Sequence, residues 1–400
     1  MAEPPPAAVY LDHAATTPVR AEVAEAMARA EADAWANPSS PHAAGRRAKR
    51  LLEDSREAIL GLLGAKAGGP GRDRLVFTSG ATEANRLAIL GLAGGGAGTF
   101  ASSARDHTSI RRTRAELAGR GWRIEDMPLT AAGCIAPGWR MPPEAEGRRL
   151  IATTLVCGQS GAVEDVHRLV GAQPDAIVHV DATQAIVCEP VSFAGLGVAS
   201  LALAPHKFEG PRGIGALVVR GDVGIEPRVP GPQEAGLRGG TEAVALAAGF
   251  ARALELAVAE RLATAARLAA LRERFSSGFA VAAAAHGFAV EAILPTGGSP
   301  HLLALAIRGG DRQAFVMAAD LAGVACATGT ACSSGSSEPS PAIAALGLPA
   351  DLVSGTVRFS FGRSTTQADV DEAVRRLAPV LARLRRFGVD LRSTQTKPSR

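Results

Sequence analysis

The chain has 400 residues, 47% hydrophobic and 20% charged, which suits a soluble globular protein large enough for two domains. The formal net charge is only +4 and the arginines are scattered, without the basic and aromatic clusters of a nucleic-acid groove, so no nucleic-acid partner is expected. No apolar run reaches the roughly 18 residues of a membrane span, and the N-terminus lacks a secretory signal, so we expect a cytoplasmic protein without a membrane partner.

The first part of the chain predicts a short strand and two helices. A proline-rich leader, residues 1–18, ends in a turn after a short apolar strand. A helix is expected over 19–36, where apolar residues recur on one face, and it should stop at the Asn-Pro pair that follows. The loop 37–42 is rich in turn formers, and a second helix is expected over 43–63.

From residue 74 onward, short apolar runs alternate with helical patterns. The predicted strands are 74–78, 98–102, 150–156, 176–180, 201–204 and 215–219. This alternation favours an α/β fold with a mostly parallel, doubly wound sheet. Ligands of such sheets bind beyond the carboxyl ends of the strands. His107, Asp181 and Lys207 all follow strand ends, so we expect them at one edge of the sheet.

The second half of the chain predicts a smaller domain. A long helix is expected over 243–285, followed by strands at 302–307 and 356–361 with helices between and after them, the pattern of an α+β domain. The expected parts are a leader at 1–18 packing with the small domain, a large ligand-binding domain at 19–255, a small domain at 256–391 and a disordered polar tail at 392–400.

A strand that ends in small and hydroxyl residues precedes one of the predicted helices. Ser79-Gly80-Ala81-Thr82 follows the strand 74–78 and opens the helix. Backbone N–H groups and the positive dipole end of such a helix attract an anion, and Thr82 adds a hydroxyl group. An ordinary helix cap formed by Ser79 or Thr82 explains the same residues equally well.

Lysine is scarce, since only Lys49, Lys66, Lys207 and Lys397 occur. Lys207 ends an apolar run, and a desolvated lysine forms a Schiff base with an aldehyde, which arginine cannot do. With Asp181 to pair with a pyridine nitrogen, His107 to stack on the ring and the anion cradle upstream, the pattern suggests pyridoxal phosphate. The alternatives are a surface lysine, a helix cap or ion pair for Asp181, and a satisfied surface histidine for His107.

The chain resembles the cysteine desulfurases of the class V aminotransferase family, which have the fold type I architecture of pyridoxal-phosphate enzymes. The resemblance runs in one collinear order from Tyr10 to about Arg363. Its motifs are YLDHAATTP (10–18), NPSSPHAAGR (37–46), TSGATEAN (78–85), DATQA (181–185), PHKFEGPRGIGAL (205–217), LRGGTE (237–242), GTACSSGSSEPS (329–340) and VRFSFGR (357–363).

The resemblance implies pyridoxal 5'-phosphate as cofactor, with Lys207 as its Schiff-base lysine and Asp181 as the partner of its pyridine nitrogen. His107 would stack on the ring and move protons, and Gln184 would donate to the phenolate oxygen. The residues implied to hold the phosphate are Ala81, through its backbone, Thr82 and His206.

Residues at the substrate side are also implied by the resemblance. Thr241 would reach the phosphate bound by the other subunit, which implies a homodimer. Arg358 would grip the substrate carboxylate, for which its planar fork is suited. Asn37 lies in the loop that lines the substrate side.

Cys332 lies in a stretch of Thr, Ser, Gly and Ala, about residues 326–340, which has little to bury and predicts a mobile loop. A thiolate there is a good nucleophile. The implied reaction is conversion of L-cysteine to L-alanine, with the sulfur carried as a persulfide on Cys332 and passed to an acceptor protein, a scaffold or sulfur carrier. Cys326 is interpreted as a packing residue. The five cysteines suggest neither a disulfide framework nor a metal site.

The chain departs from the family pattern at the site. Gly158 stands where an asparagine that touches cofactor and substrate is usual, although Gln159 is one residue away, and Ala204 replaces a phosphate-binding serine. Two alternatives therefore stay open. One is another fold type I pyridoxal-phosphate enzyme, such as a lyase, an epimerase or a selenocysteine lyase. The other is a catalytically degenerate scaffold.

Overall fold

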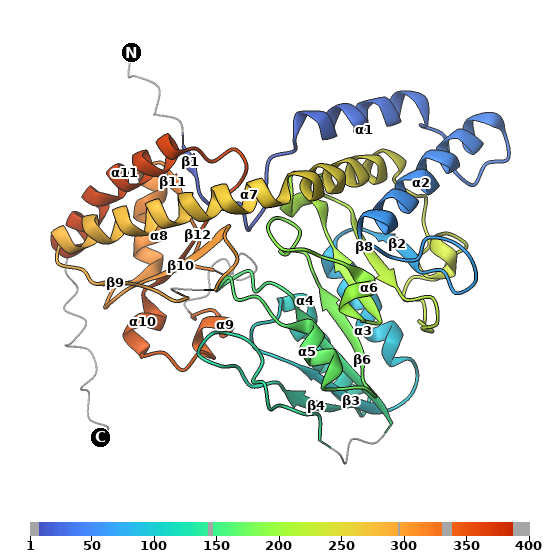
Figure 1. Ribbon diagram of the computed structural model, residues 1–400, viewed down its shortest axis with the longest axis horizontal. Helices are drawn as coiled ribbons and strands as arrows, with labels where there is room; N and C mark the ends of the chain where they lie inside the picture. Colours follow the sequence, from blue (N-terminus) through green and yellow to red (C-terminus); the bar gives the residue numbers. More distant parts are fainter. Residues whose placement is uncertain (1–7, 143–146, 295–296, 330–337, 387–400) are drawn as a thin grey trace. The chain divides into compact units, whose positions relative to one another are not determined.

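The computed structural model describes residues 8–142, 147–294, 297–329 and 338–386 (Figure 1). The chain divides into two compact units. Unit 1 comprises residues 1–15, 158–161 and 266–400, and unit 2 comprises residues 16–157 and 162–265. None of the helices in the described ranges combines the length and the apolar character that crossing a membrane requires.

Unit 2 is built on a seven-stranded sheet of order β2-β8-β7-β6-β5-β3-β4. The strands are β2 (Arg74–Thr78), β3 (Gly98–Ser102), β4 (Arg123–Asp126), β5 (Arg148–Thr154), β6 (Ile177–Asp181), β7 (Ser200–Leu203) and β8 (Gly215–Val219). β8 pairs antiparallel with both neighbours, whereas the β7-β6-β5-β3-β4 pairings are all parallel. The predicted α/β class with a mostly parallel sheet is confirmed, and the carboxyl ends of every strand except β8 lie at one edge.

Helices precede, connect and follow the strands of unit 2. They are α1 (Ala21–Asp33), α2 (Ala43–Leu62), α3 (Ala81–Ala93), α4 (Thr108–Gly119), α5 (Val166–Gly171) and α6 (Phe193–Leu196), with the 3-10 turns η1 (Pro205–Lys207) and η2 (Glu234–Gly236). The long helix α7 (Val244–Ala285) agrees with the prediction for 243–285. α1 is shorter at both ends than the predicted 19–36, because the chain leaves helical geometry at Ala34, before the Asn-Pro pair.

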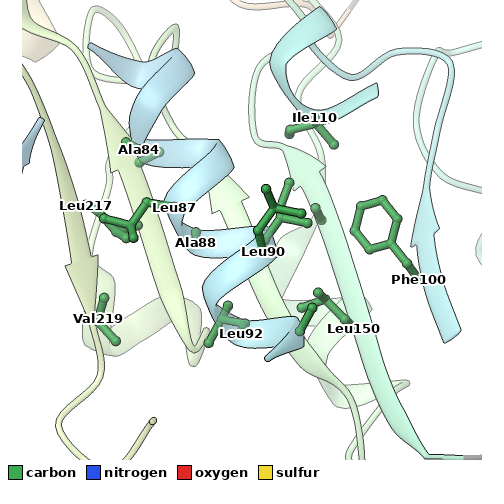
Figure 2. Close-up of a cluster of buried hydrophobic side chains, with 14 of the residues drawn as sticks. Ala84, Leu87, Ala88, Leu90, Leu92, Phe100, Ile110, Leu150, Leu217 and Val219 are labelled. Atoms are coloured by element: carbon green, nitrogen blue, oxygen red, sulfur yellow. The ribbon is translucent and has the colours of Figure 1, made fainter. Parts of the chain in front are cut away.

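The core of unit 2 lies between α3 and the sheet (Figure 2). α3 contacts β5, β6, β7 and β8, and its residues Ala84, Leu87 and Leu90 are at most 2% exposed. Because a buried leucine contributes about 1.5–3 kcal/mol, α3 is held firmly across the sheet. Its first turn therefore has a fixed position at the carboxyl edge.

A close backbone approach sets the start of α3. Gly215, the first residue of β8, pairs with Thr78, the last residue of β2. A Cβ atom at Gly215 would lie 2.5 Å from the carbonyl carbon of Gly80 and 2.9 Å from the amide nitrogen of Ala81. Only glycine fits there, so the strand and the helix start are in direct backbone contact.

Unit 1 contains a three-stranded antiparallel sheet of order β12-β10-β9 and a two-stranded parallel sheet. The strands are β9 (Val290–Ala292), β10 (Leu302–Ile307) and β12 (Thr356–Ser360), and β1 (Val9–Tyr10) with β11 (Val324–Ala325). The helices are α8 (Arg312–Leu321), α9 (Pro341–Ala344), α10 (Ala350–Ser354) and α11 (Gln367–Arg386). A cluster of phenylalanine rings forms its core, with centroids 4.6–6.4 Å apart: Phe275, Phe279, Phe315, Phe359 and Phe361.

Candidate functional site

The start of α3 presents backbone N–H groups at the carboxyl edge of the sheet. Gly80 is the N-cap residue and no side chain caps the helix, so the ordinary cap considered for Ser79 or Thr82 is not formed. The first-turn amides of Ala81 and Thr82 have no intrahelical acceptor, because the first four N–H groups of an α-helix never do. Thr82 is exposed. This end of α3 is therefore suited to an anion.

Lys207 closes the turn η1, directly after β7. Thr17 fixes this turn, since its backbone N–H and its hydroxyl group both donate to the carbonyl of His206 at 2.9 Å. The Thr17 hydroxyl oxygen also accepts from the amide of Glu209 at 2.8 Å. The half-buried Lys207 is thus held by residues of the YLDHAATTP motif. Partial burial, with the positive charges of Lys207 and Arg212 nearby, lowers the pKa of His206 to about 4.

Asp181 is the last residue of β6 and its side chain is buried. One carboxylate oxygen, Oδ2, accepts from Nδ2 of Asn85 at 2.7 Å. The other, Oδ1, accepts from the amide of Thr183 at 3.0 Å. Two donors hold the carboxylate in one orientation. A carboxylate so fixed is suited to pair with a protonated ring nitrogen.

His107 is the N-cap residue of α4. It lies four residues after the buried Ser103, which begins the loop between β3 and α4. Its Nδ1 lies 2.8 Å from the hydroxyl oxygen of Ser109 and accepts from the Ser109 amide at 3.2 Å. Desolvation and the charge of Lys207 lower the pKa of His107, against the opposing charge of Asp181. These interactions place His107, Asp181 and Lys207 in one electrostatic neighbourhood, as expected from their strand ends.

The donor set of this edge suits a phosphorylated pyridine aldehyde. The start of α3 offers amides to an anion, the Asp181 carboxylate offers a partner to a ring N–H, and Lys207 offers an amine. The buried hydroxyl oxygen of Thr183 makes no hydrogen bond within the described part of the chain. These features fit pyridoxal phosphate, with its aldehyde, ring nitrogen and phosphate, and all belong to unit 2.

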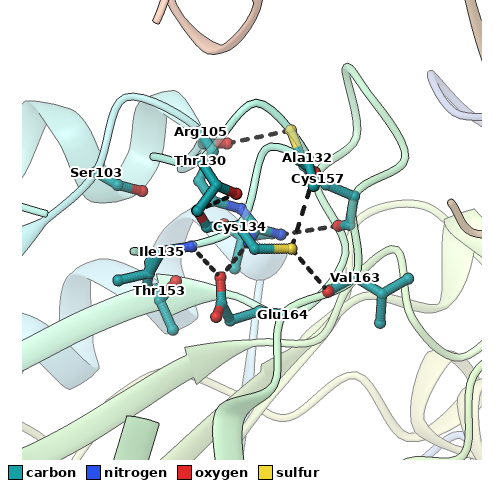
Figure 3. Close-up of polar contacts among 12 residues, drawn as sticks. Ser103, Arg105, Thr130, Ala132, Cys134, Ile135, Thr153, Cys157, Val163 and Glu164 are labelled. Carbon is teal, nitrogen blue, oxygen red and sulfur yellow. Dashed lines mark hydrogen bonds and ion pairs between the residues drawn. The ribbon is translucent and has the colours of Figure 1, made fainter. Parts of the chain in front are cut away.

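A buried ion pair anchors the loop that carries His107 (Figure 3). Arg105 and Glu164 have side chains only 1% and 0% exposed, and Nη1 of Arg105 donates to Oε2 of Glu164. Nη2 of Arg105 donates to the carbonyl of Ala162 at 2.8 Å. Glu164 also accepts from the amide of Ile135 at 2.8 Å. Because a buried pair must keep its geometry to remain favourable, it holds the loop in place two residues before His107.

In unit 1, Arg358 is a buried residue of β12, with an exposed side-chain fraction of 4%. Its Nη2 donates to Oδ1 of Asp12 at 2.7 Å, and its Nη1 donates to the carbonyl of Gly158 at 2.8 Å. Its Nε is buried and makes no hydrogen bond among the residues that the structure describes. The side chain implied to bind a carboxylate therefore already contacts one, that of Asp12.

The other predicted site residues lie in different settings. Gln184 is buried in the turn after Asp181, and Thr241 is exposed after η2. Asn37 is exposed, and its Oδ1 accepts from the amide of Ser39 at 2.9 Å. Cys332 lies outside the described residues. Burial raises the pKa of the Cys326 thiol, so this cysteine stays protonated, as suits a packing residue.

Three polar residues around Asp181 were missed by the sequence analysis: Asn85, Ser109 and His179. Asn85 is the last residue of the TSGATEAN motif and lies one turn after Thr82 on α3, a spacing that puts both on one helix face. His179 precedes Asp181 by two residues, so both side chains lie on one face of β6. Helix and strand periodicity was a signal that could have found Asn85 and His179, whereas Ser109 carries no such signal in the sequence.

Comparison with known proteins identifies the family. The model of the family described as aminotransferase class-V matches residues 9–373. The cysteine desulfurase IscS of Dictyoglomus turgidum is 33% identical over 393 residues, which cover 94% of this chain and 95% of that protein. Human selenocysteine lyase is 32% identical over 424 residues, covering 94% and 92%.

Solved structures agree with this assignment. One described as a NifS-like protein has a TM-score of 0.84 and 25% identity, and the match covers 94% of this chain and 100% of that one. Another, described as SspA in complex with cysteine, has a TM-score of 0.72 and 26% identity, with 89% and 99% covered. The chain therefore belongs to the aminotransferase class-V family.

Proposed function

We propose that this protein is a pyridoxal-phosphate-dependent cysteine desulfurase, a sulfurtransferase that converts L-cysteine to L-alanine. The observation that carries the proposal is the grouping of Lys207, Asp181 and His107 at the carboxyl edge of the unit 2 sheet, beside the start of α3. Relatives named cysteine desulfurase match nearly the whole chain at 31–33% identity, which supports the same chemistry.

The site residues divide the work around the cofactor. Bound pyridoxal phosphate supplies an electron sink for the bonds at the substrate α-carbon. Lys207 would hold it covalently, and the fixed carboxylate of Asp181 would keep its ring nitrogen protonated. Ala81, Thr82 and His206 would hold its phosphate, the last as a neutral imidazole because its pKa is about 4.

The remaining cofactor contacts follow from burial and position. Gln184, buried beside Asp181, would donate to the phenolate oxygen. His107 would stack on the ring and move protons, and its lowered pKa keeps the imidazole neutral near pH 7. Thr241, exposed after η2, would reach the phosphate of a second copy in a homodimer.

The substrate side would be formed by Arg358 and by Asn37. Arg358 would bind the carboxylate of L-cysteine through its guanidinium, sharing or displacing the Asp12 carboxylate. Gln159, whose Oε1 is buried without a hydrogen bond inside the described ranges, would contribute where the usual asparagine is Gly158. Cys332 would take the sulfur as a persulfide and pass it to an acceptor protein. Such thiol chemistry suits a reducing cytoplasm.

The proposal is tested by incubating the purified, cofactor-loaded protein with L-cysteine and measuring alanine and sulfide. We expect stoichiometric alanine, loss of the visible cofactor band in Lys207→Ala, and loss of persulfide in Cys332→Ala with the band retained. Cys326→Ala is the matched control and should keep its turnover. A protein that stays colourless with added cofactor would contradict the proposal and favour the degenerate scaffold.

Selenocysteine lyase is the second candidate, because the human enzyme of that name is 32% identical over 94% of this chain. Gly158 leaves the substrate side without its usual asparagine, which bears on substrate choice. The two activities are separated by comparing kcat/KM for L-cysteine and L-selenocysteine in the wild type and in Cys332→Ala. The lyase would be favoured if the protein turned over L-selenocysteine but not L-cysteine, and if Cys332→Ala left that turnover unchanged.

A further inference from the structure

Asn85 is at the centre of a buried hydrogen-bond network in unit 2. Its side chain is 0% exposed. Its amide nitrogen Nδ2 donates to Oδ2 of Asp181 at 2.7 Å and to the hydroxyl oxygen of Ser109 at 2.8 Å. Its Oδ1 lies 2.9 Å from Nε2 of His179. A carboxylate only accepts, so Nδ2 must face Asp181, and this fixes the orientation of the amide.

The orientation of Asn85 determines where the proton of His179 lies. Oδ1 of Asn85 can only accept, so Nε2 of His179 carries the hydrogen. Complete burial lowers the pKa of His179 to about 4, so the ring is neutral at pH 7. Its Nδ1 then accepts from the hydroxyl group of Ser200 at 2.8 Å. The amide of Asn85 is thus held from two sides: Nε2–H of His179 donates to its oxygen, and Oδ2 of Asp181 accepts from its nitrogen.

The contacts of Ser109 show which nitrogen of His107 carries the proton. The Ser109 hydroxyl oxygen accepts from Asn85, so its hydrogen is available to Nδ1 of His107 at 2.8 Å. The Ser109 amide donates to that same nitrogen at 3.2 Å. Nδ1 of His107 is therefore an acceptor, and in the neutral ring the proton is on Nε2.

We propose that Asn85 is a positioning residue that orients the Asp181 carboxylate. By turning the Ser109 hydroxyl group towards Nδ1 of His107, it also adds to the Ser109 amide in holding the proton of that ring on Nε2. This links the group that would pair with the cofactor ring nitrogen to the imidazole that would stack on the ring. An aspartate at this position would set a second carboxylate against Asp181, whereas an amide supplies both a donor and an acceptor. The part concerning the cofactor rests on the proposed function, and the tautomer does not.

The test uses full-length cofactor-free protein labelled with ¹⁵N-histidine, with the His107 signals assigned from a His107→Gln variant. Two-bond ¹H–¹⁵N spectra near pH 7.5 report the tautomer. We expect the Nε2–H form in the wild type and a several-fold larger Nδ1–H fraction in Asn85→Ala, because the Ser109 hydroxyl oxygen can then accept from Nδ1–H and only the Ser109 amide still opposes that form. Thr113→Ala, which removes another buried hydroxyl group on α4, is the matched control and should leave the tautomer unchanged.

Cofactor affinity is measured in the same proteins. Asn85→Ala should bind pyridoxal phosphate about ten- to a hundredfold more weakly, the loss expected for one hydrogen bond to a charged group. Ser109→Ala should keep the affinity within about threefold, since it keeps the Asn85–Asp181 contact. It should also keep the Nε2–H form of His107, because the Ser109 amide still donates to Nδ1 and no hydroxyl oxygen remains to accept from Nδ1–H. Asn85→Leu, of similar size, is measured in place of Asn85→Ala if that variant does not fold.

The outcomes separate this proposal from the proposed function. An Nδ1–H wild type, or a tautomer that Asn85→Ala does not shift, would overturn the link to His107. Unchanged cofactor affinity in Asn85→Ala would overturn the role at Asp181. If the wild type bound no pyridoxal phosphate while the tautomer shifted as expected, the proposed function would fail and the hydrogen-bond relay would stand.

Discussion

The buried pair between Arg105 and Glu164 gives a prediction that does not depend on any cofactor. Replacing Glu164 by glutamine keeps the size of the side chain and removes its charge. The guanidinium of Arg105, 1% exposed, would then be buried without a counterion, and one carboxylate oxygen would become an N–H donor facing other donors. Breaking a buried pair from one side costs about 3–5 kcal/mol, so we expect unit 2 to lose about 3–4 kcal/mol of its free energy of unfolding.

Urea denaturation of the cofactor-free protein, followed by tryptophan fluorescence, measures this loss. All three tryptophans, Trp35, Trp122 and Trp139, belong to unit 2, so the signal reports on the unit that holds the pair. Glu116→Gln is the matched control. Glu116 also pairs with arginines, but its side chain is 27% exposed, so its loss should cost about 0–1 kcal/mol.

A double replacement separates the charge from the packing. Arg105→Met with Glu164→Leu removes both charges and fills the space with apolar atoms, and it should recover a large part of the stability lost in Glu164→Gln. If Glu164→Gln cost less than about 1 kcal/mol, water or a neighbouring group would already satisfy the guanidinium. In that case the pair does not anchor the His107 loop.

Three further predictions concern the site. Asp12→Asn should lower KM for L-cysteine about fivefold, because a neutral amide competes less well than a carboxylate with the substrate for Arg358. A raised KM would show instead that Asp12 orients the guanidinium. Gly215→Ala should weaken cofactor binding more than about tenfold, since its Cβ would lie 2.5 Å from the Gly80 carbonyl carbon; unchanged affinity in a spectroscopic titration would contradict the close approach. The free energy of unfolding of the cofactor-free protein should be highest above about pH 6.5 and fall towards pH 4, by up to about 1.4 kcal/mol per pH unit for each buried histidine. It falls because the unfolded chain binds protons that the folded chain excludes. Denaturation at pH 7 and pH 5 measures this fall, and equal stability would refute it. The histidines whose pKa burial lowers to about 4 are His13, His179 and His206.

The sheet and its edge could be predicted because their signals are local. Each strand of unit 2 predicted from an apolar run is present, and residues placed after a strand end, such as Asp181 and Lys207, lie where a parallel sheet puts them. The roles of the site residues came from the resemblance of the sequence motifs to those of the family. Strand direction carried no such signal, and the antiparallel β8 emerges only from its pairing with β2 and β7.

The contacts of the site could not be predicted because they join distant residues. Asn85 meets Asp181 across 96 positions, and Arg358 meets Asp12 across 346. A buried asparagine on a helix looks, in sequence, like any polar residue on that helix, and nothing in the spacing says which carboxylate it will meet. Sequence periodicity gives the face on which a side chain lies, whereas the partner depends on how the sheet is ordered.

The residues proposed to hold the cofactor do not by themselves determine the reaction. Those proposed to act within one copy of the chain, from Ala81 to Lys207, all belong to unit 2, and Thr241 would act on a second copy. These cofactor contacts commit the protein to pyridoxal-phosphate chemistry but to no particular reaction. Cys332→Ala should therefore keep cofactor affinity within about twofold while abolishing the persulfide, and losses of both would show that Cys332 also affects cofactor binding.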